Sequence, residues 1–290
     1  MKKIVLFLNI SIALLFIGCK QESKTESTID KIAVKERNEP KKTSFHLENT
    51  KEWLSKNSAD STNFAIAYAV NRTDAANFKK MDSVVIPDDM SGDIEFYLPF
   101  PLSVSSLKEI NKIVFFSYPT QTFAAYEKGE LVYTGPTNMG REKDKTPTGL
   151  FFTNWKAEET TSTFDDEWDL RWNFNIENKL GVGWHQYTLP GYPASHSCLR
   201  LQEKDARKLY DFADQWELAN PETVKVKGTP VIVFGSYDFK APKPWLELVK
   251  NSKALTISEN EIETVTKPFM ESILKEQKIR QDFQNKGNNI

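Results

Sequence analysis

Short apolar runs separated by turn residues fill the segment from Lys112 to Tyr237, and this pattern constrains the fold more than any other feature of the chain. Runs of a few β-branched and aromatic residues bounded by turns are typical of strands. Two of the runs flank Lys128-Gly129, which predicts a hairpin. The strand candidates are Ile113 to Phe116, Phe123 to Tyr126, Leu131 to Tyr133, Phe151-Phe152, Trp172 to Ile176, Gly183 to Tyr187 and Val231 to Phe234.

One amphipathic helix is predicted among these strands, after Cys198, because apolar residues recur there at helical spacing. They are Ala206, Leu209, Tyr210, Ala213 and Trp216. Outside the strand-rich segment we expect helices over Leu47 to Lys56, Trp245 to Val249 and Lys267 to Phe283, an apolar element over Asn63 to Val70, and a brief strand over Val84 to Pro87. These patterns predict an α+β fold that is mainly β, with small helical extensions at both ends.

The charge balance excludes one class of partner. The 290 residues carry a formal net charge of −2. A nucleic-acid-binding protein needs a basic surface to neutralise phosphates. We therefore expect no nucleic-acid partner.

The first residues have the composition of an export signal. Lys2 and Lys3 precede an apolar stretch over 4–17, which is shorter than the ~20 residues that span a bilayer as a helix. It ends in Phe16-Ile17-Gly18-Cys19, which resembles a bacterial lipobox, where the cysteine receives a lipid. We expect a lipoprotein signal peptide over 1–18 and a membrane anchor through lipidated Cys19, with an uncleaved membrane anchor as the alternative.

The segment over 19–45 is rich in charges of both signs, which predicts a solvated, flexible tether. With or without cleavage, the body of the protein is expected outside the cytoplasm, in the cell envelope. Lys20 stands where an aspartate would indicate inner-membrane retention in enterobacteria. We therefore favour the periplasmic face of the outer membrane over the inner membrane.

Cys198 is the one thiol left in the chain if Cys19 carries a lipid, so it has no intramolecular disulfide partner. A thiol becomes a nucleophile when a base removes its proton, and His185 and His196 are the candidate bases. A buried, inert cysteine with two structural histidines is one alternative. A metal site is another, although one cysteine and two histidines supply three ligands and His46 is remote in sequence.

The residues around Cys198 resemble the signature of a known family. Tyr192-Pro-Ala-Ser-His-Ser-Cys-Leu-Arg-Leu201 is similar to the Ser-His-Gly-Cys motif of the L,D-transpeptidase (YkuD) family. Val114 to Tyr133 resembles the family's opening hairpin, and Met139-Gly140 with Thr146-Pro-Thr-Gly149 resembles its "G…TPTG" element. Thr229 to Gly235 resembles its closing strand, so the resemblance covers 112–237.

The resemblance implies a YkuD-like β-sandwich or barrel and a cysteine enzyme that acts on peptidoglycan stem peptides without a cofactor or metal. Cys198 corresponds to the nucleophile, His185 to the general acid/base and Gln186 to the residue whose backbone carbonyl orients His185. The thiol attacks a tetrapeptide stem, releases D-Ala and transfers the acyl group to an amine, giving a 3→3 cross-link. The positions implied to line the oxyanion and substrate pocket or to contact the donor stem are Ser195, His196, Ser197 and Arg200.

The expected organisation follows from this resemblance. A catalytic domain at 108–237 lies between a small N-terminal region at 46–107 and a C-terminal helical extension at 238–290. Arg200 has an alternative structural role in a surface ion pair with Glu203 or Asp205. Trp172 and Trp184 are expected in the core or on the wall of a substrate groove.

Two departures from the family pattern bear on donor specificity and turnover rate rather than on the chemistry. Ser197 replaces a glycine, which would cost roughly 1 kcal/mol of strain if that position needs a positive φ. The loop between His185 and Ser195 is short, as in a short-loop subgroup. An L,D-carboxypeptidase or a hydrolase that cuts cross-links or wall anchors would use the same Cys/His site. A catalytically silent wall-binding lipoprotein would keep the fold alone.

Overall fold

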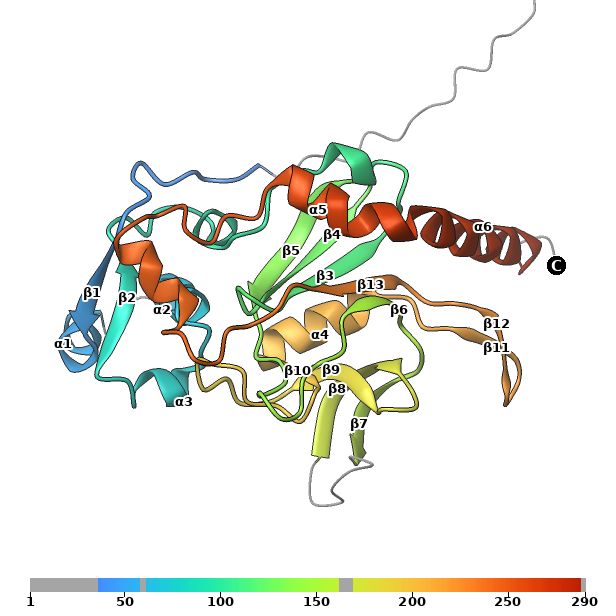
Figure 1. The fold of residues 1–290 in the computed structure, drawn as a ribbon, viewed down its shortest axis with the longest axis horizontal. Helices are drawn as coiled ribbons and strands as arrows, with labels where there is room; N and C mark the ends of the chain where they lie inside the picture. The colour runs from blue at the N-terminus through green and yellow to red at the C-terminus, as the bar shows by residue number, and fades with distance from the viewer. Residues whose placement is uncertain (1–35, 58–60, 162–168, 288–290) are drawn as a thin grey trace, which may run out of the picture. The chain divides into compact units, whose positions relative to one another are not determined.

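The computed structural model describes residues 36–57, 61–161 and 169–287, which all belong to one compact unit. Figure 1 shows the course of the chain. The strands are β1 Phe45–Asn49, β2 Ser83–Pro87, β3 Ile113–Ser117, β4 Thr122–Glu127, β5 Glu130–Pro136, β6 Gly149–Phe152, β7 Lys156–Thr161, β8 Asp169–Glu177, β9 Val182–Gln186, β10 Leu199–Leu201, β11 Glu217–Asn220, β12 Thr223–Val226 and β13 Pro230–Phe234. The α-helices are α1 Thr50–Lys56, α2 Ser61–Val70, α3 Ala75–Phe78, α4 Glu203–Phe212, α5 Glu259–Thr266 and α6 Met270–Gly287. The expected signal peptide, Cys19 and most of the tether lie outside the described residues.

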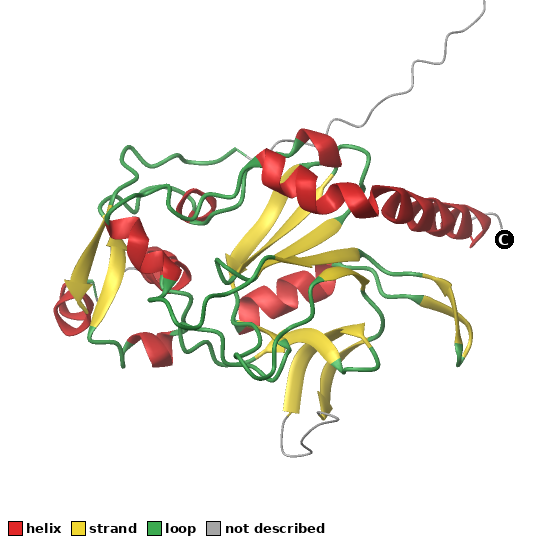
Figure 2. Ribbon diagram, viewed as in Figure 1, coloured by secondary structure: helices red, strands yellow, loops and turns green. Residues whose placement is uncertain are grey.

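Two larger sheets build the centre of this unit. One has the strand order β5-β4-β3-β13-β6, and the other has the order β10-β9-β8-β7. Most neighbours are antiparallel, but β3 pairs with β13 and β9 pairs with β10 in parallel. Figure 2 shows helix α4 between the two sheets. The mainly β, α+β architecture with a helix after Cys198 is confirmed.

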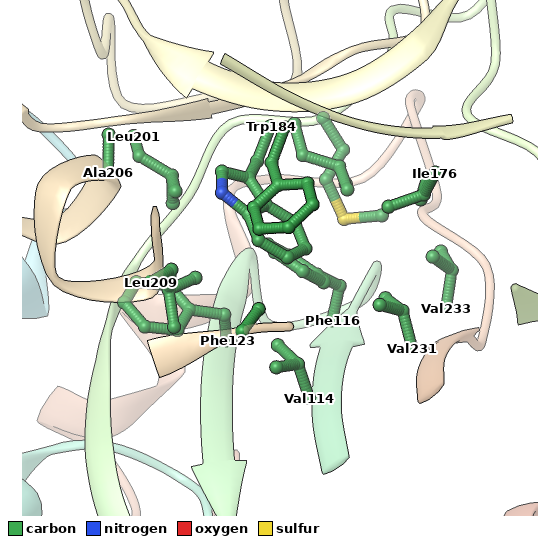
Figure 3. Close-up of a cluster of buried hydrophobic side chains, with 14 of the residues drawn as sticks. Val114, Phe116, Phe123, Ile176, Trp184, Leu201, Ala206, Leu209, Val231 and Val233 are labelled. Carbon is green, nitrogen blue, oxygen red and sulfur yellow. The ribbon is translucent and has the colours of Figure 1, made fainter. Parts of the chain in front are cut away.

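The main core lies where the two sheets and α4 meet. Phe116 and Val231 come from the first sheet, Trp184 from the second and Leu209 from α4, and all are at most 1% exposed (Figure 3). The opposite face of the first sheet is covered too, because Phe115 packs in a second cluster with residues after β13. Strand β3 is therefore buried on both faces, as its unbroken apolar sequence predicts.

Helix α4 is shorter than its apolar spacing predicts. It ends at Phe212 because Ala213 takes an extended conformation, with ψ at 144°. Trp216 therefore lies beyond the helix, where its backbone N–H donates to the carbonyl of Asn154. The prediction that Trp216 continues the helical face was wrong.

The helix predicted over Leu47 to Lys56 was wrong for its first three residues. Residues up to Asn49 pair antiparallel with β2, and the helix begins only at Thr50. Asn49 fixes this start, since its side chain accepts hydrogen bonds from the amides of Lys51 and Glu52. A tertiary strand pairing thus overrides a local helical pattern. The apolar element over Asn63 to Val70 belongs to α2, and the strand ending at Pro87 is confirmed.

The C-terminal extension contains more helix than the sequence predicts. Pro244–Val249 and Lys267–Phe269 form 3₁₀ turns, α6 begins at Met270, and α5 was not predicted at all. Ser258 caps α5 by accepting from the backbone N–H of Glu261. In the part of the chain that the structure describes, no helix combines the length and apolar character needed to cross a bilayer.

Candidate active site

The side chains of the parallel strands β9 and β10 lie on two opposite faces of their sheet. Leu199 lies opposite Trp184 and Arg200 lies opposite His185. Side chains alternate along a strand, so the faces can be assigned from burial. Trp184 and Leu199 are fully buried in the core. His185 and Arg200 therefore share the other face, and Cys198, two residues before Arg200, lies on that face with them.

This face opens into a cavity of about 320 Å³. Its walls come from β8, from β9 and β10, from the end of β7 and from the turn before Cys198. The residues lining it are Trp155, Thr160, Thr161, Leu170, Asn173, Asn175, Asn178, Gly181, His185, Tyr187, Ser195, His196, Cys198 and Arg200. Five of the predicted site residues, namely His185, Ser195, His196, Cys198 and Arg200, are thus brought together.

His185 is held in one orientation by its own strand. Its ring is 5% exposed, and Nδ1 lies 3.0 Å from the backbone carbonyl of Gln186, to which it donates in the neutral tautomer protonated at Nδ1. Nε2 has no hydrogen-bond partner among the described residues. Burial lowers the pKa of His185 to about 4, and the positive charge of Arg200 acts in the same direction. The imidazole is therefore neutral at pH 7 and free to accept a proton at Nε2.

Cys198 is half-buried directly before β10, and its thiol lies 3.6 Å from the carbonyl of Gly181. Burial raises the pKa of the Cys198 thiol, and a backbone hydrogen bond from Gly183 and the charge of Arg200 offset part of the rise. Both Cys198 and His185 are therefore neutral at rest. A thiolate forms here only as its proton leaves.

The turn before Cys198 is fixed by two hydroxyl groups. Ser195 Oγ donates to the backbone carbonyl of Cys198 at 2.5 Å, and Thr146 Oγ1 donates to the carbonyl of Ser197 at 2.8 Å. Ser197 has a φ of +80°, a conformation that favours glycine. The strain anticipated for a serine at this position is therefore present.

The same turn contains the backbone N–H groups of Ser197 and Cys198. Among the described residues, the structure shows no acceptor for the N–H groups of Ser197 and Cys198. His196, between Ser195 and Ser197, is exposed at the mouth of the cavity. Unpaired amides beside a nucleophile are the groups that stabilise a developing oxyanion.

Arg200 is anchored by an aromatic ring. Its guanidinium carbon lies 4.4 Å from the centre of the Tyr187 ring. Within the described residues Arg200 forms no ion pair, since Glu203 contacts Arg171 at 3.6 Å and Asp205 is buried. The alternative of a surface ion pair with Glu203 or Asp205 was wrong, and the charge of Arg200 is available to the cavity.

Neither predicted tryptophan lines the cavity. Trp184 is in the core and Trp172 packs against it, while Trp155 lines the cavity instead. No cluster of three His, Cys, Asp or Glu side chains that could hold a metal occurs within 36–57, 61–161 and 169–287. His46 lies on β1, where its ring contacts Asp88 and Glu48.

A known family model matches the part of the chain that contains this cavity. Residues 111–233, which we call the YkuD segment, match the YkuD family model, the L,D-transpeptidase catalytic domain. The match spans less than half of the chain, and its limits agree with the resemblance over 112–237. The fold of this segment is thus YkuD-like, and the expected fold is confirmed.

Solved structures of L,D-transpeptidases resemble the YkuD segment at low identity. An L,D-transpeptidase from Stackebrandtia nassauensis is 24% identical over 44% of this chain and 57% of its own, with a TM-score of 0.36. One from Mycobacterium smegmatis is 21% identical over 43% and 59%, and one from Mycobacterium tuberculosis H37Rv is 20% identical over 43% and 58%, both with TM-scores of 0.35. The chain thus aligns with less than two thirds of these proteins. No curated protein matches it.

Some residues of the site were missed from the sequence. Tyr187, whose ring lies against Arg200, directly follows the last residue of β9 and lies two residues after His185, a spacing that strand periodicity offers as a signal. Thr146 stands in the motif Thr-Pro-Thr-Gly, but its contact with Ser197 spans 51 residues. Asn173 and Asn175 line the cavity from β8. Nothing local in the sequence marks such long-range neighbours.

Proposed function

We propose that this protein is a lipid-anchored peptidoglycan L,D-transpeptidase that uses Cys198 as its nucleophile. The observation that carries the proposal is the placement of Cys198 and His185 on one face of β9–β10, inside the cavity of the YkuD segment. The carbonyl of Gln186 fixes the His185 tautomer, which supports the division of roles in a nucleophile–base–orienter triad.

In the first step, His185 Nε2 takes the thiol proton as Cys198 Sγ attacks the stem carbonyl that precedes the terminal D-Ala. The bond to the D-Ala nitrogen then breaks, and His185 returns the proton to that nitrogen as it leaves. Sγ and the acyl carbon remain joined as a thioester. Because thiol and imidazole are both neutral at rest, the proton moves during attack rather than before it.

In the second step, an amine of a neighbouring stem attacks the thioester. His185 removes a proton from this amine, the carbon–sulfur bond breaks, and the thiol regains its proton. The products are a cross-linked pair of stems and free Cys198. The N–H groups of Ser197 and Cys198 are suited to hold the oxyanion in both steps, and Arg200 is suited to a carboxylate of the donor stem.

The proposed location is the periplasmic face of the outer membrane, with lipid on Cys19. The lipobox-like ending at Gly18-Cys19 and the charged segment over 19–45 support it. Mass spectrometry of the protein from a membrane fraction would test this, since Cys19→Ser should abolish the lipid mass and the membrane association.

The proposed reaction is tested with muropeptides. Incubation of the purified chain with tetrapeptide muropeptides should give dimers and free D-Ala, and Cys198→Ala or His185→Ala should lower turnover by at least about 10³-fold. Loss of D-Ala without dimers would instead identify an L,D-carboxypeptidase, in which water replaces the amine. Cleavage of supplied dimers would identify a hydrolase of cross-links.

A silent wall-binding protein is motivated by the strained Ser197, and it makes a different prediction. It would give no product and no covalent adduct at Cys198 with an acylating inhibitor. Imipenem is the ligand named for one of the similar solved structures, an L,D-transpeptidase, and it is a suitable probe. An intact-mass increase that disappears in Cys198→Ala would exclude the silent alternative.

A further inference from the structure

The loop between β9 and β10 is held by residues from outside the YkuD segment. Thr73 and Asp74 lie between α2 and α3, in the N-terminal region, and both contact Leu189. Asp74 Oδ2 accepts from the backbone N–H of Leu189 at 2.7 Å, and the Asp74 N–H donates to the Leu189 carbonyl at 3.2 Å. Both backbone groups of Leu189 are therefore satisfied by Asp74.

Thr73 strengthens the same attachment. Its hydroxyl donates to the Leu189 carbonyl at 2.9 Å, and its backbone forms a bridge with Pro190. The carbonyl of Thr73 also accepts from the side chain of Gln202, the residue after β10, at 2.9 Å. Thr73 thus contacts the chain on both sides of the segment that carries Cys198.

The contact is buried and is shared with a helix start. Thr73 and Leu189 are fully buried, so water cannot replace a hydrogen bond that is lost there. The second oxygen of Asp74 caps α3 by accepting from the N–H of Asn77 at 2.8 Å. One carboxylate therefore joins α3 of the N-terminal region to the loop beside the cavity.

The loop needs such support because the strand pair it connects is short. β9 and β10 share three paired positions, which place His185 and Arg200 side by side. The loop begins with Tyr187, whose ring lies against Arg200 and 5.9 Å from the His185 ring. Movement of Leu189 would be transmitted over two residues to Tyr187.

We infer that Thr73 and Asp74 are positioning residues of the Cys198–His185 site, so that the N-terminal region is part of the active-site scaffold. They act through the loop and touch no reacting atom. The turnover measurement rests on the proposed function. The reactivity of the Cys198 thiol can be measured whether or not that function is correct.

The test compares Thr73→Val with Thr73→Ser in the full chain. Valine has nearly the shape of threonine but cannot donate to Leu189, whereas serine keeps the hydroxyl. Two quantities are measured at each pH: the rate of Cys198 alkylation by iodoacetamide, read by mass spectrometry of the Cys198 peptide, and the turnover of tetrapeptide muropeptides.

In Thr73→Val, local opening of the loop should expose the half-buried thiol further to water. Alkylation should become about tenfold faster near pH 7, and its pH midpoint should fall toward that of an ordinary thiol. Muropeptide turnover should decrease by about tenfold in Thr73→Val. In Thr73→Ser, the alkylation rate and the turnover should both stay near those of the parent chain.

Val84→Ala is the matched control. Val84 is fully buried in the N-terminal region beside Trp53 and Phe78, and the structure shows no contact between it and the loop. Val84→Ala should lower the melting temperature without changing the rate of Cys198 alkylation.

Two outcomes would overturn the inference. One is an equal alkylation rate in Thr73→Val and the parent chain, and the other is an equal increase of that rate in Val84→Ala. If the parent forms no muropeptide product, the proposed function fails while alkylation still decides the role of Thr73.

Discussion

At the residue scale, Ser197 has a left-handed backbone conformation directly beside the proposed nucleophile. Its φ of +80° places a side chain where glycine is favoured, yet Thr146 binds its carbonyl and the next residue is Cys198. Left-handed conformations of non-glycine residues persist where the surroundings determine them. The turn therefore depends on the hydroxyl of Thr146 as well as on its own sequence.

The free energy of unfolding of Ser197 variants should follow how well the new residue tolerates a positive φ. Ser197→Gly should raise the free energy of unfolding by up to about 1 kcal/mol, because relief of strain exceeds the entropy that glycine adds to the unfolded chain. Ser197→Val should lower it by at least about 1 kcal/mol, because a β-branched residue resists this conformation. Urea unfolding measures both, and a glycine variant less stable than the parent would contradict the assignment.

At the element scale, helix α4 carries a buried acid that the proposed mechanism does not use. Asp205 is 1% exposed, and Oδ1 accepts from the hydroxyl of Tyr133 at 2.6 Å while Oδ2 has no partner among the described residues. Burial raises the pKa of Asp205 to about 6. A folded-state pKa above the unfolded value means that the protonated form stabilises the fold at low pH. This contribution is lost as the pH rises through about 6.

Asp205→Asn should therefore gain stability relative to the parent as the pH rises. Between pH 4 and pH 8, the difference in the free energy of unfolding should shift toward the variant by up to about 3 kcal/mol. Urea unfolding across this pH range measures the shift, and a difference that is constant with pH would contradict it. Tyr133→Phe is the control, because loss of the Tyr133 hydrogen bond should raise the pKa of Asp205 further and enlarge the pH dependence.

The elements also show what a sequence can predict. Strands such as β3 and β13 were predicted because they contain continuous apolar runs between turns. The strands β7, β11 and β12 were missed because their side chains are mostly polar and exposed. Cys198 and His185 were found through residue chemistry and motif. Thr73, Asp74 and Thr146 were not, because their contacts span 51 to 116 residues and leave no local pattern.

At the scale of the whole molecule, the YkuD segment depends on chain at both of its ends. Ile257, Ile262 and Ile273 cover the face of the first sheet that points away from the main core. Arg280 of α6 donates to the carbonyls of Lys227 and Gln215, which tie α6 to the segment between α4 and β13. On the other side, Arg72 is fully buried and donates to the carbonyl of Thr120 at 2.6 Å.

A fragment limited to 108–237 should therefore fail to fold cooperatively. Each buried isoleucine contributes about 1.5–3 kcal/mol, so removing three of them costs an amount comparable to the ~5–15 kcal/mol stability of a whole domain. Near-ultraviolet circular dichroism during heating should show one sharp transition for the full chain and none for the fragment. A chain ending at Arg280 keeps all three isoleucines and should melt like the full chain. If the fragment melted as sharply as the full chain, the flanking regions would be additions to an autonomous domain.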